Sequence, residues 1–206
     1  MPILDISPRI STRLAVWPGD VPYRRDVTCA FSGGANLDLS STHATVHLGA
    51  HTDAPSHYHP DGVGIHARPL ERYYGACEVI RVAVARGERI RPAHLPHRPT
   101  APRVLLHTGT FPNPEAWNND FAALSPDLVH WLADAGVQLV GIDTPSVDLF
   151  DDKALLSHQA IYARDLAVLE GIVLDAIPSG PYTLIALPLA LEGADASPVR
   201  AALVTP

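Results

Sequence analysis

The chain has 206 residues, of which 47% are apolar and 18% are charged, and its formal net charge is −7. This length predicts a single domain over residues 1–206 with a sizeable core, while the acidic balance excludes the basic surface that binding to nucleic acid or an anionic membrane needs. No apolar run is long enough to span a bilayer, and Asp5 breaks the pattern of a secretory signal, so we expect a cytoplasmic protein. The two cysteines, Cys29 and Cys77, form no CxxC motif and are expected to be reduced and buried.

Several segments have the patterns of strands. Residues 41–47 alternate in polarity, which is typical of a half-buried strand. Short apolar and β-branched runs predict further strands at 77–85, 103–107, 138–142, 182–191 and 199–204. Pro188 lies inside one of these runs and indicates a sheet edge or a bulge. The proline-rich stretch 91–102 is interpreted as a surface loop, because apolar runs flank it closely.

One helix has clear boundaries in the sequence. Ser125 is a suitable N-cap, Pro126 suits the first helical position, and Gly136 suits the end. Apolar residues recur on one face of this segment, at Leu124, Leu128, Leu132 and Ala135. A second helix is expected to begin near Ser157. The first helix lies between two predicted strands, which indicates a βαβ unit, so the fold class is α/β or α+β with one mixed sheet and flanking helices.

The most informative segment is rich in histidine. Five of the 11 histidines fall between residues 43 and 59, and the segment contains His47, His51, Asp53 and His57. Imidazole and carboxylate side chains together suit zinc and related metals. Gly49 indicates a turn that lets His47 and His51 converge. The competing interpretation is a histidine-rich surface loop, and it is the preferred one for the outlying His43 and His59.

A second cluster is needed to complete a site, and His158 and Glu170 are its candidates. Glu170 follows an apolar stretch, so its carboxylate is expected either at an exposed turn or buried with a partner such as a metal. A serine-hydrolase mechanism is disfavoured because the sequence has no G-x-S-x-G nucleophile elbow. Asp143 and Ser146 are therefore interpreted as structural or supporting residues.

These residues resemble the bacterial kynurenine formamidase (arylformamidase) branch of the metal-dependent cyclase-like hydrolases. That family carries an HxGTHxDxPxH motif, which here covers residues 47–57 with Ala50 in place of threonine. Further segments similar to the family follow in the same order along the chain, at residues 16–20, 141–146, 158, 169–171, 187–189 and 195–200.

The resemblance implies a site with two divalent metal ions, most often zinc. His47 and His51 would bind the first metal and His158 the second. Asp53 and Glu170 would contact both. A hydroxide held between such ions is a strong nucleophile at neutral pH, because metal binding lowers the pKa of water to about 7.

The resemblance also implies a substrate and a fold. His57 would be the proton shuttle, and Trp17 would contact the aromatic ring of N-formyl-L-kynurenine, whose formamide would be hydrolysed to L-kynurenine and formate. The fold would be of the swivelling β/β/α type, and the protein a homodimer. Arg164 and Arg200 are open candidates for the substrate carboxylate. Two alternatives stay open, namely a hydrolase of cyclic amides such as isatin and a metal-binding module without catalysis.

Overall fold

The computed structural model describes residues 2–206, whose centre is a mixed sheet of seven strands. The strand order is β1-β13-β11-β5-β7-β9-β10. The four strands from β5 to β10 pair in parallel, whereas the other pairs are antiparallel. The bounds of the sheet strands are β1 Ile3–Asp5, β5 Tyr74–Arg81, β7 Arg103–His107, β9 Leu139–Ile142, β10 Ala167–Leu169, β11 Gly180–Ile185 and β13 Ala202–Val204.

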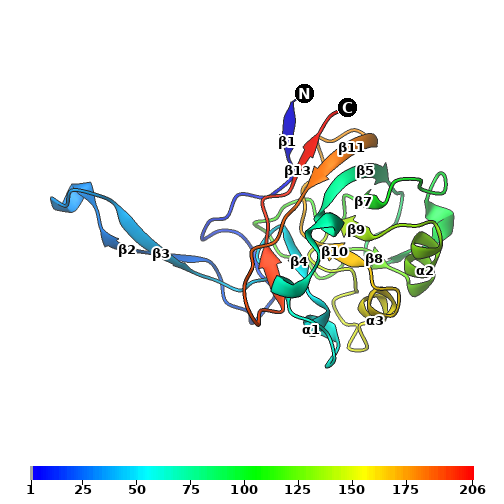
Figure 1. The fold of residues 1–206 in the computed structure, drawn as a ribbon, viewed down its shortest axis with the longest axis horizontal. Helices are drawn as coiled ribbons and strands as arrows, with labels where there is room; N and C mark the ends of the chain where they lie inside the picture. The colour runs from blue at the N-terminus through cyan, green and yellow to red at the C-terminus, as the bar shows by residue number, and fades with distance from the viewer. Residues whose placement is uncertain (1) are drawn as a thin grey trace.

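Two apolar cores lie on opposite faces of this sheet. Alternation along β7 divides its residues between them, since Val104 and Leu106 join one core and Leu105 joins the other. The first core is covered by α2 (Pro126–Asp134) and α3 (Leu156–Ala163), which pack on the parallel half (Figure 1). The prediction of an α/β or α+β fold with one mixed sheet and flanking helices is confirmed.

The predicted βαβ unit is present. The α2 helix connects β7 and β9, which run parallel. The Ser125 hydroxyl accepts a hydrogen bond from the Leu128 amide at 3.1 Å, and Gly136 follows the helix with a φ of +85°. A side-chain cap and a glycine with positive φ are local signals, which explains why the sequence locates this helix well.

Shorter elements connect the sheet to the rest of the fold. Three two-stranded pairs lie outside it, and two of them are β4 with β12 and β6 with β8. None of the helices in residues 2–206 is long and apolar enough to cross a membrane. The bounds of these elements are β4 His51–Asp53, α1 Pro55–Tyr58, β6 Arg89–Ile90, β8 Ala123–Leu124 and β12 Ala196–Pro198, and single 3-10 turns occupy Phe31–Gly33, Ile65–Ala67, Leu70–Tyr73 and Pro92–His94.

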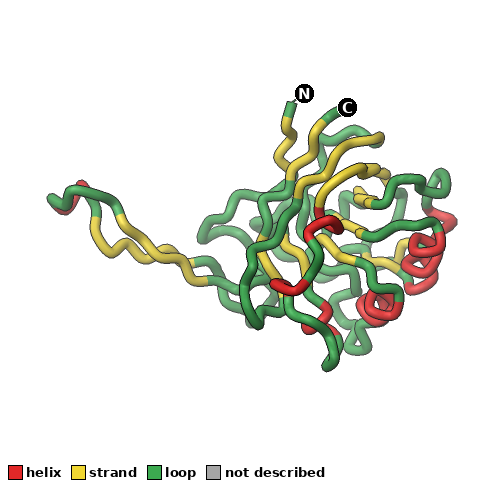
Figure 2. Tube along the Cα trace, in the orientation of Figure 1, coloured by secondary structure: helices red, strands yellow, loops and turns green. Residues whose placement is uncertain are grey.

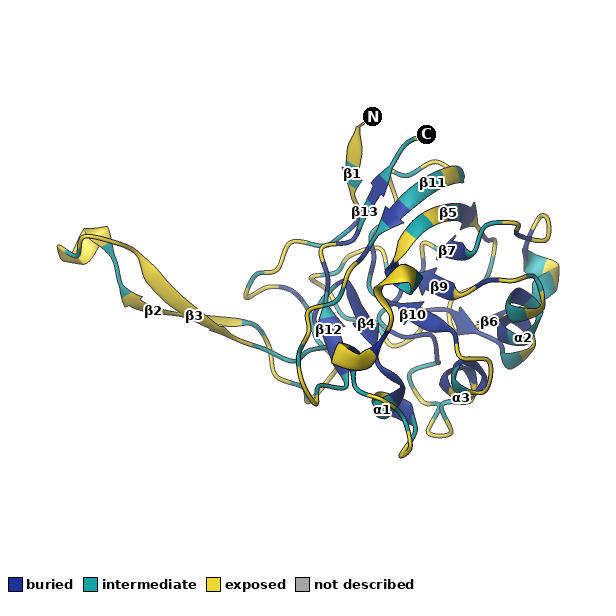
Figure 3. Cartoon of the chain, viewed as in Figure 1, coloured by how far each residue is buried: buried dark blue, intermediate teal, exposed yellow. Residues whose placement is uncertain are grey.

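A long hairpin projects from this body (Figures 1 and 2). It consists of β2 (Arg24–Cys29) and β3 (Leu39–His43), and we refer to residues 24–43 as the arm. The prediction of a half-buried strand at 41–47 is wrong in position and in burial, because the strand ends at His43 and is exposed on both faces (Figure 3). Alternation shows that a strand has two different faces, but it does not show whether another element covers one of them.

Other predicted boundaries and burial also differ. The strand expected at 182–191 ends at Ile185, so Pro188 lies beyond it rather than at a bulge. The strand expected at 77–85 spans Tyr74–Arg81 instead. Cys77 is buried and free, as predicted, whereas Cys29 is free but only half-buried because it lies on the arm.

Candidate metal centre

The loop before β4 and the strand itself carry the first group of candidate ligands. His51 and Asp53 lie two residues apart on β4, so their side chains point to the same side. Gly49 adopts a φ of +60° between His47 and His51. The predicted turn at Gly49 is therefore present, and it brings His47 to within 2.9 Å of Asp53, measured from Nδ1 to Oδ1.

Glu170 reaches this group through a backbone contact between distant segments. His51 and Glu170 form an isolated antiparallel bridge, in which each amide donates to the other residue's carbonyl at 3.1 and 2.9 Å. The next residue, Gly171, has a φ of +65°, and a Cβ there would lie 2.2 Å from the Gly49 carbonyl oxygen. Only glycine allows the two chains to approach this closely, so Gly171 is what lets Glu170 join the histidine loop.

His158 approaches from the opposite side, on α3. Its Nε2 lies 3.2 Å from Asp53 Oδ2 and 3.6 Å from Glu170 Oε1. The other oxygens of the same two carboxylates face His51, whose Nε2 lies 3.4 Å from Asp53 Oδ1 and 3.2 Å from Glu170 Oε2. Each carboxylate therefore stands between histidines of the two groups, which is the arrangement needed to contact two neighbouring ions.

Each of the three histidines is oriented by an oxygen outside the cluster. The Nδ1–H of His51 donates to the Gly49 carbonyl at 2.9 Å, and that of His158 donates to Asp148 Oδ2 at 2.9 Å. The Nε2–H of His47 donates to Asp195 Oδ2 at 3.0 Å. In its neutral form each ring then presents its unprotonated nitrogen to the central carboxylates, as metal-binding histidines do.

The electrostatics of the cluster fit a bound cation. Asp53 Oδ1 is buried and lies 2.9 Å from His47 Nδ1, which can donate to it only while the imidazole is protonated. Burial opposes the charged form of His47, but Asp53 and Asp195 outweigh it and raise the pKa of His47 to about 9. Burial likewise opposes the charge on His158, but Asp148 and Asp53 raise its pKa to about 10. Two buried carboxylates thus require positive charge, which either protonated histidines or divalent ions bound to the same nitrogens and oxygens could supply.

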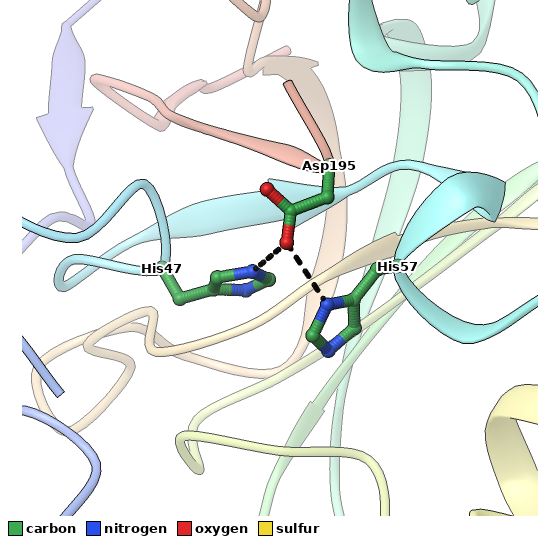
Figure 4. Close-up of side chains that lie close together, drawn as sticks. All are labelled: His47, His57 and Asp195. Carbon is green, nitrogen blue, oxygen red and sulfur yellow. Dashed lines mark hydrogen bonds and ion pairs between the residues drawn. The ribbon is translucent and has the colours of Figure 1, made fainter. Parts of the chain in front are cut away.

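His57 stands beside His47, one member of this cluster (Figure 4). It lies on α1, its side chain is 33% exposed, and its ring centroid is 4.2 Å from that of His47. Its Nδ1 lies 3.2 Å from Asp195 Oδ2, the same oxygen that His47 contacts. Asp195 lies 138 residues from His57, and because no local pattern connects the two, its role could not be predicted from the sequence.

A cavity of about 520 Å³ is lined by the clustered candidate ligands and by a wall of aromatic side chains. Trp17 lines this cavity and stacks on Phe150, with ring centroids 5.0 Å apart and planes inclined by 30°. Trp117 meets Trp17 edge-on at 5.3 Å and also lines the cavity. The other aromatic residues of this wall are scattered through the chain, so Trp17 was the only one of them predicted from the sequence.

Several other candidates lie away from the cavity. Arg164 pairs with Asp134 and Arg200 with Asp5, and neither arginine lines the cavity. His59 stacks on a tyrosine ring, and His43 lies on the exposed arm, so the interpretation of both as structural or solvated histidines is supported.

Asp143 and Ser146 support the loops around the cavity. The Asp143 carboxylate accepts hydrogen bonds from the backbone amides of Thr108 and Gly109, and the Ser146 hydroxyl accepts one from the Asp148 amide. These hydrogen bonds agree with the structural role expected for both residues. Both also line the cavity.

Comparison with known proteins gives consistent matches. Residues 4–149 match the family model described as "Putative cyclase". The chain is 45% identical to the kynurenine formamidase of Bordetella petrii and 46% identical to that of Bordetella avium, in each case over 97% of this chain and 96% of the relative.

Solved structures agree on the fold. A structure described as a potential metal-dependent hydrolase with cyclase activity is 25% identical, with a TM-score of 0.82 over 98% of this chain and 96% of that one. Isatin hydrolase A from Labrenzia aggregata has the same TM-score of 0.82 over 100% of this chain and 94% of that one, at 21% identity. The likeness to isatin hydrolase A shows a shared fold and nothing further.

Proposed function

The chain belongs to the cyclase family, together with the kynurenine formamidases, and from this premise we propose that it hydrolyses N-formyl-L-kynurenine to L-kynurenine and formate. The observation that carries the proposal is the pair of buried carboxylates, Asp53 and Glu170, each facing histidines on both sides next to an aromatic cavity. We assign residues 1–206 to one hydrolase domain.

The five clustered side chains would hold two divalent ions. His47 and His51 would bind the first, His158 the second, and Asp53 and Glu170 both. Zinc is the proposed metal, since nitrogen and oxygen donors of this kind suit it. When bound, such ions act as Lewis acids that polarise a carbonyl and favour ionisation of water.

His57 would move the protons of the reaction. Hydrolysis adds the oxygen of water to the formyl carbon, breaks the carbon–nitrogen bond and requires a proton on the departing aniline nitrogen. With Nδ1–H engaged by Asp195, the His57 Nε2 is free to accept a proton from water and return it to the nitrogen. An imidazole suits this task because one ring nitrogen can accept a proton while the other remains protonated.

Trp17 and the aromatic wall would hold the ring of the substrate. Trp17 is 36% exposed at the cavity and is braced by Phe150 and Trp117. A ring stacked on this wall would lie in the same cavity as the metal cluster, and the stacking would help to align the formamide with it.

We also propose that the protein is a homodimer formed through the arm. A two-stranded hairpin is marginally stable by itself in water, and this one is exposed on both faces. Its exposed apolar side chains, at 46–64% exposure, are Val27, Phe31, Leu37 and Leu39. Light scattering of the purified protein tests this, because a monomer at micromolar concentration would contradict it.

The function is tested by assaying N-formyl-L-kynurenine hydrolysis before chelation, after chelation and after zinc is added back. We expect activity that disappears with the chelator and returns with zinc. Isatin serves as the comparison substrate in the same three states. Faster turnover of isatin would favour the cyclic-amide alternative, and bound zinc without hydrolysis of either compound would favour a binding module.

A further inference from the structure

We propose that Asp195 is a positioning residue, which holds His47 and His57 in one orientation and one tautomer through a single carboxylate oxygen. This inference rests on the proposed function, because it assigns Asp195 to the support of a metal ligand and of the proton-transfer residue.

The geometry around Asp195 determines which ring nitrogens carry protons. Asp195 Oδ2 lies 3.0 Å from His47 Nε2 and 3.2 Å from His57 Nδ1 (Figure 4). An ionised carboxylate can only accept hydrogen bonds, so both rings must donate. Neutral His47 is thereby held as the Nε2–H tautomer and neutral His57 as the Nδ1–H tautomer.

Each tautomer leaves the other nitrogen free for a different task. The Nδ1 of His47 faces Asp53 Oδ1 at 2.9 Å and is available to a metal ion. The Nε2 of His57 is available for proton transfer in the cavity that this residue lines. One oxygen thus couples metal binding and proton transfer, whereas a free imidazole would exchange between tautomers.

The fold places Asp195 independently of its side-chain contacts. Strand β12 pairs with β4, with Ala196 opposite Asp53, and the Ala54 amide donates to the Asp195 carbonyl at 2.8 Å. The strand pair that carries His51 and Asp53 therefore also positions Asp195. Its side chain is 48% exposed, so substitution is expected to leave the core intact.

The test compares Asp195→Ala and Asp195→Asn with a control, Glu192→Gln, which changes an exposed acidic residue on the same loop. Zinc affinity is measured by chelator competition, the His57 tautomer by 15N NMR of the zinc-loaded protein, and kcat and KM with N-formyl-L-kynurenine. For Asp195→Ala we expect zinc affinity and kcat to fall by about 10–100-fold each, with KM nearly unchanged. The His57 signal should shift from the Nδ1–H form toward the Nε2–H form. Asp195→Asn, which keeps an acceptor oxygen, should lose less zinc affinity and less kcat than Asp195→Ala.

The inference is overturned if Asp195→Ala keeps the His57 tautomer and the zinc affinity of the wild type, even if kcat falls. It is also overturned if Glu192→Gln loses as much zinc affinity and kcat as Asp195→Ala. If the wild-type protein does not hydrolyse N-formyl-L-kynurenine, the proposed function fails, while the tautomer and zinc measurements still decide the role of Asp195.

Discussion

Replacing Gly171 with alanine tests whether the close approach of two chain segments builds the metal centre. Gly171 combines a φ of +65° with a position where a Cβ would lie 2.2 Å from the Gly49 carbonyl oxygen. The neighbouring atom belongs to the backbone, so it cannot move aside as a flexible side chain could. Relieving the overlap requires the Glu170 segment and the His47–His51 loop to separate by about 1 Å, since ordinary carbon–oxygen contacts need about 3.3 Å or more.

A second glycine provides a control that separates the cost of the left-handed backbone from the cost of the steric overlap. Gly87 has a similar φ of +74°, but a Cβ there meets nothing within 4 Å. Gly87→Ala should therefore cost only the left-handed backbone penalty of about 1–2 kcal/mol. Gly171→Ala should cost at least about 3 kcal/mol, because the overlap adds to the same penalty. The corresponding decreases in Tm are about 2–8 °C and at least about 6 °C.

Urea unfolding gives the change in the free energy of unfolding for each of the two variants. Zinc affinity and kcat are measured on the same samples. Gly171→Ala should lower kcat by about 100-fold, since a misplacement of about 1 Å costs that much, whereas Gly87→Ala should leave kcat and zinc affinity unchanged. Equal destabilisation by the two substitutions, or full zinc affinity in Gly171→Ala, would refute the reasoning that this contact assembles the site.

Three further predictions concern the same centre. Because the pKa values of His47 and His158 are raised to about 9 and about 10, their contribution to the stability of the metal-free protein is complete below about pH 6.5 and is lost as the pH rises through those values. Zinc must displace these protons, so the increase in Tm on adding zinc should grow between pH 6.5 and 9, and an increase independent of pH would contradict this. Asp148→Asn weakens the hydrogen bond that orients His158 and should lower zinc affinity by about 10–100-fold in a chelator competition, with circular dichroism checking the fold. Trp17→Leu removes a stacking surface worth about 0.5–1.5 kcal/mol, so KM should rise by about 2–10-fold with zinc content unchanged, and an unaltered KM would exclude ring stacking at this residue.

Features of the fold whose signals are local could be predicted from the sequence alone. The α2 helix has its cap, its proline and its terminal glycine within a few residues, and the buried runs on either side predicted β7 and β9. The candidate ligands from His47 to Asp53 lie in one short segment, so their residue types and the turn at Gly49 were visible without a structure.

The meeting of distant parts of the site depends on tertiary contacts that no local pattern predicts. Glu170 joins the histidine loop through a backbone bridge to His51, and Asp195 reaches His57 through the register of β12 on β4. Strand pairing joins residues more than a hundred positions apart, and the pattern along one strand does not specify its partner or register. For the same reason, the alternation at 41–47 could not show that this segment would end an exposed arm instead of entering the core.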